Sequence, residues 1–156
     1  RIVSSLMPLF MIAGGFLAGY TSDGLFGSRR GPVIAIAFTG QALCMFLLYI
    51  NINSAWLAAI CIMFTLLFIQ AAHSIISGTM SMDLGGRKAT GTATGLIDGA
   101  QYLMGSVAGY GMGRALDMYK STGHEFFIWP LIPIPMALIG MLCACSIWSL
   151  KTKHEH

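Results

Sequence analysis

Asp98 is the leading candidate for a functional charged residue, because it lies within the otherwise uncharged, glycine-rich segment Thr90–Met112. If this segment crosses a membrane, its carboxylate is costly to bury and is expected to face a partner group or an aqueous cavity. It could then bind a substrate group, carry a proton or pair with a basic residue. If the helix begins later than expected, Asp98 would instead lie at the level of the lipid head groups.

Gln70 and His73 are polar residues in an apolar run, three positions apart and therefore on one helix face. A histidine in a membrane-spanning helix can relay protons or bind an anionic ligand. More often it forms a hydrogen bond to a neighbouring helix. Asp98, His73 and Gln70 are therefore the candidate residues for substrate binding or coupling. Gln41 and Gln101 are weaker candidates of the same kind.

Charges are also concentrated in the segment Gly19–Gly31, between two apolar runs. Asp23 can cap a following helix or form an ion pair with Arg29 or Arg30. Such a pair would hold two helices together at one side of a membrane, and breaking it would release that side. A simple solvated turn is the alternative. The residues of this candidate conformational gate are Asp23, Arg29, Arg30, Gly19 and Gly27.

The composition predicts that membrane-spanning helices position these residues. The chain has 156 residues, of which 56% are hydrophobic and only 10% are charged, whereas about 25% of a soluble domain is charged. No Asp, Glu, Lys or Arg occurs in 2–22 or 31–82, and a spanning helix needs about 20 mostly apolar residues. The net charge of +3 is better explained by cytoplasmic loops than by a nucleic-acid partner.

Five spanning helices are expected, joined by short polar segments. Their approximate ranges are 2–20, 32–50, 55–76, 90–112 and 126–150. The expected loop 77–89 carries Asp83, Arg87 and Lys88. Because successive helices alternate in direction, this loop, the loop 21–31 and the C-terminal tail share one side. That side has six of the nine basic residues, which favours the cytoplasm.

The helix expected at 90–112 and the residues just after it are rich in glycine at a spacing of four, which places each series on one helix face. Missing side chains there let another backbone approach closely. This indicates either tight static packing or a helix that slides against a partner. The two series are Gly91, Gly95 and Gly99, and Gly105, Gly109 and Gly113.

The sequence contains no constellation typical of an enzyme. There is no nucleophile elbow, zinc-binding helix or phosphate loop. The four cysteines lie in apolar runs without histidine or aspartate at metal-ligand spacing. We therefore expect neither catalysis nor a cofactor or metal.

Two blocks of residues resemble one transporter family. The segment Gly19–Gly31 resembles the major facilitator superfamily signature between helices eight and nine, in the form found in the organophosphate:phosphate antiporters. Its pattern is Asp23-x-Leu25-Phe26-Gly27-x-Arg29-Arg30-Gly31. Gly24 departs from that pattern, since the family usually has a basic residue there. Met82–Leu84 with Arg87–Gly95 resembles the loop and start of helix eleven in hexose-phosphate members, and Leu96–Gly99 resembles the same helix in animal sugar-phosphate exchangers.

The resemblance implies an all-α membrane protein, a helical bundle with about five of the twelve transmembrane helices. Residues 1–156 would be part of the C-terminal six-helix half, helices eight to twelve, and a first residue other than Met agrees with a fragment. The implied function is exchange of a sugar phosphate or glycerol phosphate for inorganic phosphate by alternating access. The implied partners are the lipid bilayer, a small anionic substrate and the missing N-terminal half, in the cell (inner) membrane. The family's phosphate-gripping arginines lie on helices one and seven, so no position here inherits that role.

Three other interpretations stay open. The chain could belong to another major facilitator carrier, such as a proton-coupled exporter of small molecules, with Asp98 or His73 carrying the proton. It could belong to a membrane receptor that senses a sugar phosphate without moving it. It could also be a remnant that does not transport.

Overall fold

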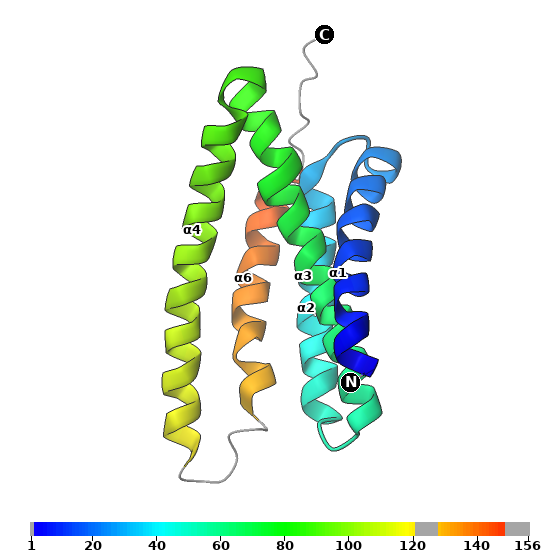
Figure 1. The fold of residues 1–156 in the computed structure, drawn as a ribbon, viewed down its shortest axis with the longest axis vertical. Helices are drawn as coiled ribbons and strands as arrows, with labels where there is room; N and C mark the ends of the chain where they lie inside the picture. Colours follow the sequence, from blue (N-terminus) through cyan, green and yellow to red (C-terminus); the bar gives the residue numbers. More distant parts are fainter. Residues whose placement is uncertain (1, 121–127, 149–156) are drawn as a thin grey trace.

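The computed structural model describes residues 2–120 and 128–148, except for the side chains of 2–4 and 87. Every regular element in this part is helical, which confirms the expected all-α class. The α-helices are α1 (Ile2–Tyr20), α2 (Arg30–Ile50), α3 (Ala55–His73), α4 (Ser81–Lys120) and α6 (Pro133–Ser146). They run up and down beside one another, as Figure 1 shows.

Four of the described segments are long and apolar enough to cross a membrane. They are Ser5–Leu25, Arg30–Ile50, Ala55–Gly86 and Trp129–Ser146. The expected span 90–112 lies within α4 but is not among them. This helix is long enough to cross a membrane. Its many glycine, threonine and alanine residues carry little apolar surface, however, so its mean hydropathy is too low for it to be included. The described part thus has the five expected α-helices, of which four meet the length and hydropathy of a membrane span and α4 is only weakly apolar.

The expected loop 77–89 is wrong, because the chain stays helical almost to its end. A π-helical segment, η2 (Ser74–Met80), continues α3 directly into α4. The reversal occurs instead at Gly86, which has φ 56° and ψ −173°, a backbone conformation open essentially to glycine alone. We call the continuous stretch Ala55–Gly86 the long arm. At 1.5 Å per residue its 32 residues span about 48 Å, more than the hydrocarbon core of about 30 Å.

Helix α1 also ends in a π-helical turn, η1 (Thr21–Leu25), before the chain reverses into α2. The reversal uses two residues with positive φ, Gly27 at 55° and Ser28 at 62°. Helix α2 then begins at Arg30, two residues before the expected start. This small shift matters because it places Arg30 inside the first helical turn rather than in a flexible loop.

The last helix begins later than expected, and its proline residues explain why. A 3-10 turn, η3 (Trp129–Leu131), precedes α6, whose first residue is Pro133. Proline lacks an N–H donor and is best tolerated in a first helical turn. Residues 126–127 and 149–150 of the expected helix, and the polar tail, lie outside the described part.

The core lies among α1, α2, α3, η2 and α6 and is built from small and branched side chains. Buried members include Ala18, Val33, Ile34, Ala71, Ala72, Ile75 and Ala144. Glycines bring the helices close together: a Cβ added to Gly14 would lie 2.2 Å from the carbonyl oxygen of Leu67. Gly31 is similarly close to the backbone at Ile147 and Trp148.

The arrangement of the ends agrees with the expected topology. The turn between α1 and α2, the reversal at Gly86 and the C-terminal end of α6 all lie at one end of the bundle (Figure 1). We call this the gate end. After Gly86, α4 returns along the bundle and meets the other described elements mainly through η2.

Candidate functional site

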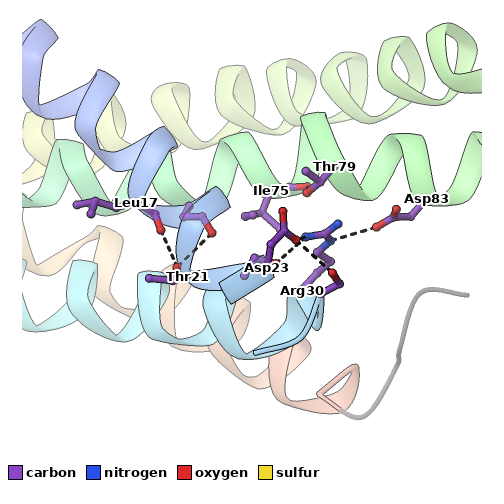
Figure 2. A network of polar contacts seen from close by, with 10 residues as sticks. Leu17, Thr21, Asp23, Arg30, Ile75, Thr79 and Asp83 are labelled. Atoms are coloured by element: carbon purple, nitrogen blue, oxygen red, sulfur yellow. Dashed lines mark hydrogen bonds and ion pairs between the residues drawn. The ribbon is translucent and has the colours of Figure 1, made fainter. Parts of the chain in front are cut away.

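Arg30 is the centre of a polar network at the gate end. Its side chain is only 10% exposed. Its Nη1 lies 2.7 Å from Asp23 Oδ1 and also donates to Ser22 Oγ at 2.7 Å. Its Nε lies 3.1 Å from Asp83 Oδ2. Figure 2 shows Asp23 and Asp83 reaching the same guanidinium from different segments.

Three segments bring these groups together. Ser22 and Asp23 belong to η1, Arg30 starts α2, and Asp83 lies near the end of the long arm. A guanidinium presents several N–H donors in a fixed fork, so one arginine can bind partners on different elements at the same time. The network therefore fastens the end of α1 and the start of α2 to the long arm.

The turn between η1 and α2 folds so that Asp23 and Arg30 can meet. Backbone hydrogen bonds close it, from Phe26 N to Thr21 O at 3.2 Å and from Ser28 N to Ser22 O at 2.9 Å. Ser28 Oγ also donates to Asp23 Oδ1 at 3.3 Å. Because Gly27 has a positive φ, a residue with a Cβ would strain this turn.

The two carboxylates differ in burial. The side chain of Asp83 is 18% exposed, whereas that of Asp23 is 61% exposed. Water and salt therefore screen the Asp23 pair more strongly than the Asp83 pair. The Asp83 pair is therefore the less screened of the two links, although its contact is the longer one, and it joins residues farther apart in sequence.

The structure distinguishes among the predicted gate residues. Asp23 pairs with Arg30, one of the two partners expected, while Arg29 is exposed and forms no ion pair among the described residues. Gly19 lies in α1, and no atom would come within 4 Å of a Cβ built there. Lys88 is exposed in α4, and the side chain of Arg87 lies outside the described part.

Asp83 was missed as a gate residue, since the sequence placed it in a solvated loop. One signal was available, because Asp83 is the only carboxylate between Asp23 and Asp98. A lone acid in so apolar a stretch is expected to find a basic partner.

A second polar set joins the long arm to α4. His73 Nδ1 lies 2.8 Å from Gln101 Oε1, to which Ser77 Oγ also donates at 3.3 Å. Farther along, Thr94 Oγ1 donates to Ser81 Oγ at 2.8 Å. Ser77 and Ser81 are buried. We call these five residues the polar seam.

Asp98 lies on the same face of α4 as the seam residues Thr94 and Gln101, four positions after one and three before the other. Its Oδ1 is buried and has no hydrogen-bond partner among the described residues. The structure thus places Asp98 beside a set of hydrogen-bonding groups without joining it to them.

The other predicted residues are distributed more widely. His73 forms the interhelical hydrogen bond that is common for such a histidine, and Gln101 is its partner. Gln70 lies elsewhere, in a shallow depression of about 570 Å³ lined otherwise by α1, with Pro8, Met11, Ile12, Gly15 and Phe16.

The glycine series on α4 has no packing partner in this structure. No described atom lies within 4 Å of a Cβ built at Gly91, Gly95, Gly99, Gly105, Gly109 or Gly113. The glycines in tight contact are instead Gly14, Gly31, Gly40, Gly85 and Gly140. A packing role for the α4 series remains a prediction about a partner beyond the described residues.

Known proteins with similar sequences are named as a membrane sensor or as transporters of phosphate compounds. The membrane sensor protein UhpC of Salmonella typhimurium is 27% identical over 151 residues, 97% of this chain and 34% of that protein. A probable hexose phosphate transport protein of Chlamydia muridarum is 29% identical, covering 96% of this chain and 34% of its own length. The glycerol-3-phosphate transporter of Bacillus subtilis is 25% identical over 93% of this chain and 32% of its own length.

The chain is a homologue of the organophosphate:phosphate antiporters of the major facilitator superfamily. No protein-family profile and no solved structure matches it. The chain spans about a third of the length of the curated relatives reported above. Those relatives are named as transporters or as a sensor, and none of the three is named as an enzyme.

Proposed function

We propose that the protein containing this chain exchanges an organophosphate, a sugar phosphate or glycerol phosphate, for inorganic phosphate by alternating access. The chain would supply helices eight to twelve, and an N-terminal half outside it would complete the central cavity. The observation that carries the proposal is the Arg30 network, which fastens three segments at one end of the bundle. The names of the homologues support the substrate class.

In this proposal the Arg30 network stabilises the state in which the gate end is closed. Two carboxylates and a hydroxyl hold the guanidinium while the network is intact. Breaking a buried pair leaves an uncompensated charge, at a cost of about 3–5 kcal/mol for full burial. An imbalance of even about 1.4 kcal/mol changes a two-state population ratio tenfold. A network of this strength is sufficient to bias the transport cycle.

Arg30 is not proposed to bind the transported phosphate. Its guanidinium already contacts Asp23 and Asp83, and two carboxylates repel an approaching phosphate at the same position. Substrate binding is proposed instead for the middle of the bundle. Asp98 and His73 are the candidates there beside the polar seam, and Gln70 is a separate candidate on the side that faces α1. The cell (inner) membrane is the proposed location.

A second function has its own support, because the Salmonella homologue is named a membrane sensor. A sensor would use the same helices and the same gate to report binding without net movement of substrate. A proton-coupled exporter is the third candidate. It is supported by Asp98 Oδ1, which has no hydrogen-bond partner in the part of the chain that the structure describes.

Counterflow separates these functions. The full-length protein is reconstituted in vesicles loaded with labelled inorganic phosphate, and external glucose 6-phosphate, glycerol 3-phosphate or buffer is added. An exchanger releases label only when an external organophosphate is present. A sensor retains the label although it binds the same compound, and a proton-coupled exporter responds to a pH gradient instead. Retention of label under every condition, with binding demonstrated, would overturn the exchange proposal in favour of the sensor.

A further inference from the structure

The depression between α1 and α3 follows one face of α1. Its lining residues on that helix occupy positions i, i+3, i+4, i+7 and i+8, the spacing of a single helix face. They are Pro8, Met11, Ile12, Gly15 and Phe16. Gly15 adds no side chain, and a Cβ built there would lie 3.8 Å from Ser74 Oγ at the start of η2. The missing side chain leaves this face hollow where α1 meets the long arm.

Gln70 is the polar residue of the lining, and it lies near the middle of the long arm. It is fifteen residues after Ala55 and sixteen before Gly86, the two ends of that arm. Its amide forms no hydrogen bond among the described residues, although an amide can both donate and accept. Lipid tails offer neither donors nor acceptors. An amide at this depth is therefore expected to face a polar ligand or another polypeptide.

The shape of the lining favours a compact ligand over another helix. Helices in membranes approach one another through small residues. Here the bulky side chains of Met11, Ile12 and Phe16 surround Gly15, and that of Phe16 is 77% exposed. They would hold a second helix away from the Gln70 amide, whereas a small molecule can enter between them. The volume of about 570 Å³ lies within the range of small-molecule sites, about 300–1,000 Å³.

The lining does not fit a phosphate group. No charged residue lines the depression in the part of the chain that the structure describes, and 2–22 and 31–82 contain neither Lys nor Arg. A buried phosphate needs cations or several N–H donors to offset its desolvation. The phosphate of an organophosphate is therefore expected to be bound by groups outside the depression.

The carbon skeleton of a sugar phosphate does fit. Sugar hydroxyls donate and accept hydrogen bonds, as the Gln70 amide does. The exposed ring of Phe16 can cover the C–H face of a sugar ring, and Met11 and Ile12 provide further apolar contact. Such a combination of apolar walls and one orienting polar group is typical of small-molecule sites. Glycerol phosphate has a short open chain without a ring face, so it would contact less of this lining.

We propose that the depression is the subsite for the sugar of a hexose phosphate. Gln70 forms hydrogen bonds with the sugar hydroxyls, and Phe16 covers the apolar face of the ring. The subsite selects a hexose phosphate over glycerol phosphate, while the phosphate group is held elsewhere. This inference rests on the proposed exchange, because the N-terminal half must close the open side of the depression. It deepens that proposal by naming the substrate and the residues that recognise its sugar.

Calorimetric binding to the purified full-length protein tests the subsite without requiring transport. The probes are glucose 6-phosphate, glycerol 3-phosphate and inorganic phosphate. Phe16→Ala should weaken binding of glucose 6-phosphate about tenfold, weaken glycerol 3-phosphate less and leave inorganic phosphate unchanged. Phe16→Tyr keeps the flat ring and should bind all three as wild type does. Leu17→Ala is the control, since Leu17 is exposed on α1 but outside the lining, and its three affinities should be unchanged.

Gln70→Leu tests the polar part of the subsite from the other helix. It should weaken glucose 6-phosphate about two- to tenfold, the range for a neutral hydrogen bond, without affecting inorganic phosphate. If this variant fails to give folded protein, Phe16→Ala carries the test, because its site is exposed. Equal weakening of all three probes would overturn the proposal and indicate that the depression seats part of the N-terminal half. Tighter wild-type binding of glycerol 3-phosphate than of glucose 6-phosphate would also overturn it.

Phosphate homoexchange in vesicles separates failure of the subsite from failure of the exchange function. Selective loss of glucose 6-phosphate binding in Phe16→Ala and Gln70→Leu, without homoexchange by wild type, would support the subsite and contradict exchange. Homoexchange by wild type, with unchanged glucose 6-phosphate binding in both variants, would support exchange and overturn the subsite.

Discussion

Arg30 and Asp83 are 53 residues apart in sequence, yet Nε of one lies 3.1 Å from Oδ2 of the other. The pair joins the first residue of α2 to the end of the long arm, and Asp23 completes it from the turn after α1. Because Asp83 is on a helix that extends past the hydrocarbon core, its position is fixed by the whole arm. Bending of that arm would therefore be transmitted directly to the gate.

Removing each carboxylate should affect stability according to its burial. Asp83→Asn is expected to lower the free energy of unfolding by about 1.5–3 kcal/mol, the range for a hydrogen bond to a charged group. Asp23→Asn, at a more exposed site, should lower it by at most about 1 kcal/mol. Reversible unfolding in mixed detergent micelles, followed by circular dichroism, measures both. Asp117→Asn is the exposed control, and equal losses for Asp23 and Asp83 would contradict the ranking.

Gly14→Ala should separate α1 from α3. The added Cβ would lie 2.2 Å from the carbonyl oxygen of Leu67, and overpacking of this kind costs about 1–3 kcal/mol. Gly19→Ala, in the same helix, meets no atom within 4 Å and should stabilise the helix by up to about 1 kcal/mol. The same unfolding assay compares them. A shift of the same sign in both variants would show that the α1–α3 contact is not as close as described.

Gly95→Leu tests whether the glycine series on α4 meets a partner outside this chain. No described atom lies within 4 Å of the site, so a leucine should fit the described bundle. If this face contacts the other half of the full-length protein, Gly95→Leu should reduce the rate of phosphate exchange at least about tenfold. That decrease corresponds to about 1.4 kcal/mol in activation free energy. Ala100→Leu adds an equal side chain on another face and should be tolerated. Undiminished exchange by Gly95→Leu would show that this face packs against nothing essential.

Sequence reasoning predicted the helices well where charge-free runs were long. It also named Arg29 or Arg30 as the partner of Asp23, and the structure shows Arg30 in that position. It failed at 77–89, where glycines and charged residues suggested a loop although the segment also contains serine and threonine. There the hydroxyls bond back to the helix itself, as from Thr79 Oγ1 to Ile75 O at 3.1 Å. Such bonds make polar residues compatible with a helix, and no local pattern distinguishes them from turn formation.

The contacts of the candidate site depend on tertiary geometry in the same way. That Asp83 reaches Arg30, and that Gln101 meets His73, follows from how far the long arm continues before Gly86 reverses it. The glycine spacing on α4 predicted close packing of another helix, and this stays a prediction because no described neighbour lies at those positions. It could not show whether a neighbour within this chain covers that face.

The proposed function depends on the direction in which each helix crosses the membrane. Labelling of single cysteines with a membrane-impermeant maleimide tests this topology most directly. Single cysteines replace Arg29, Lys88 and Asn53, all exposed, in a cysteine-free full-length protein in oriented vesicles. Arg29→Cys and Lys88→Cys should react from the same side, and Asn53→Cys only from the opposite side. Reaction of Arg29→Cys and Lys88→Cys from opposite sides would contradict a shared gate end, and with it the alternating-access function proposed for the protein.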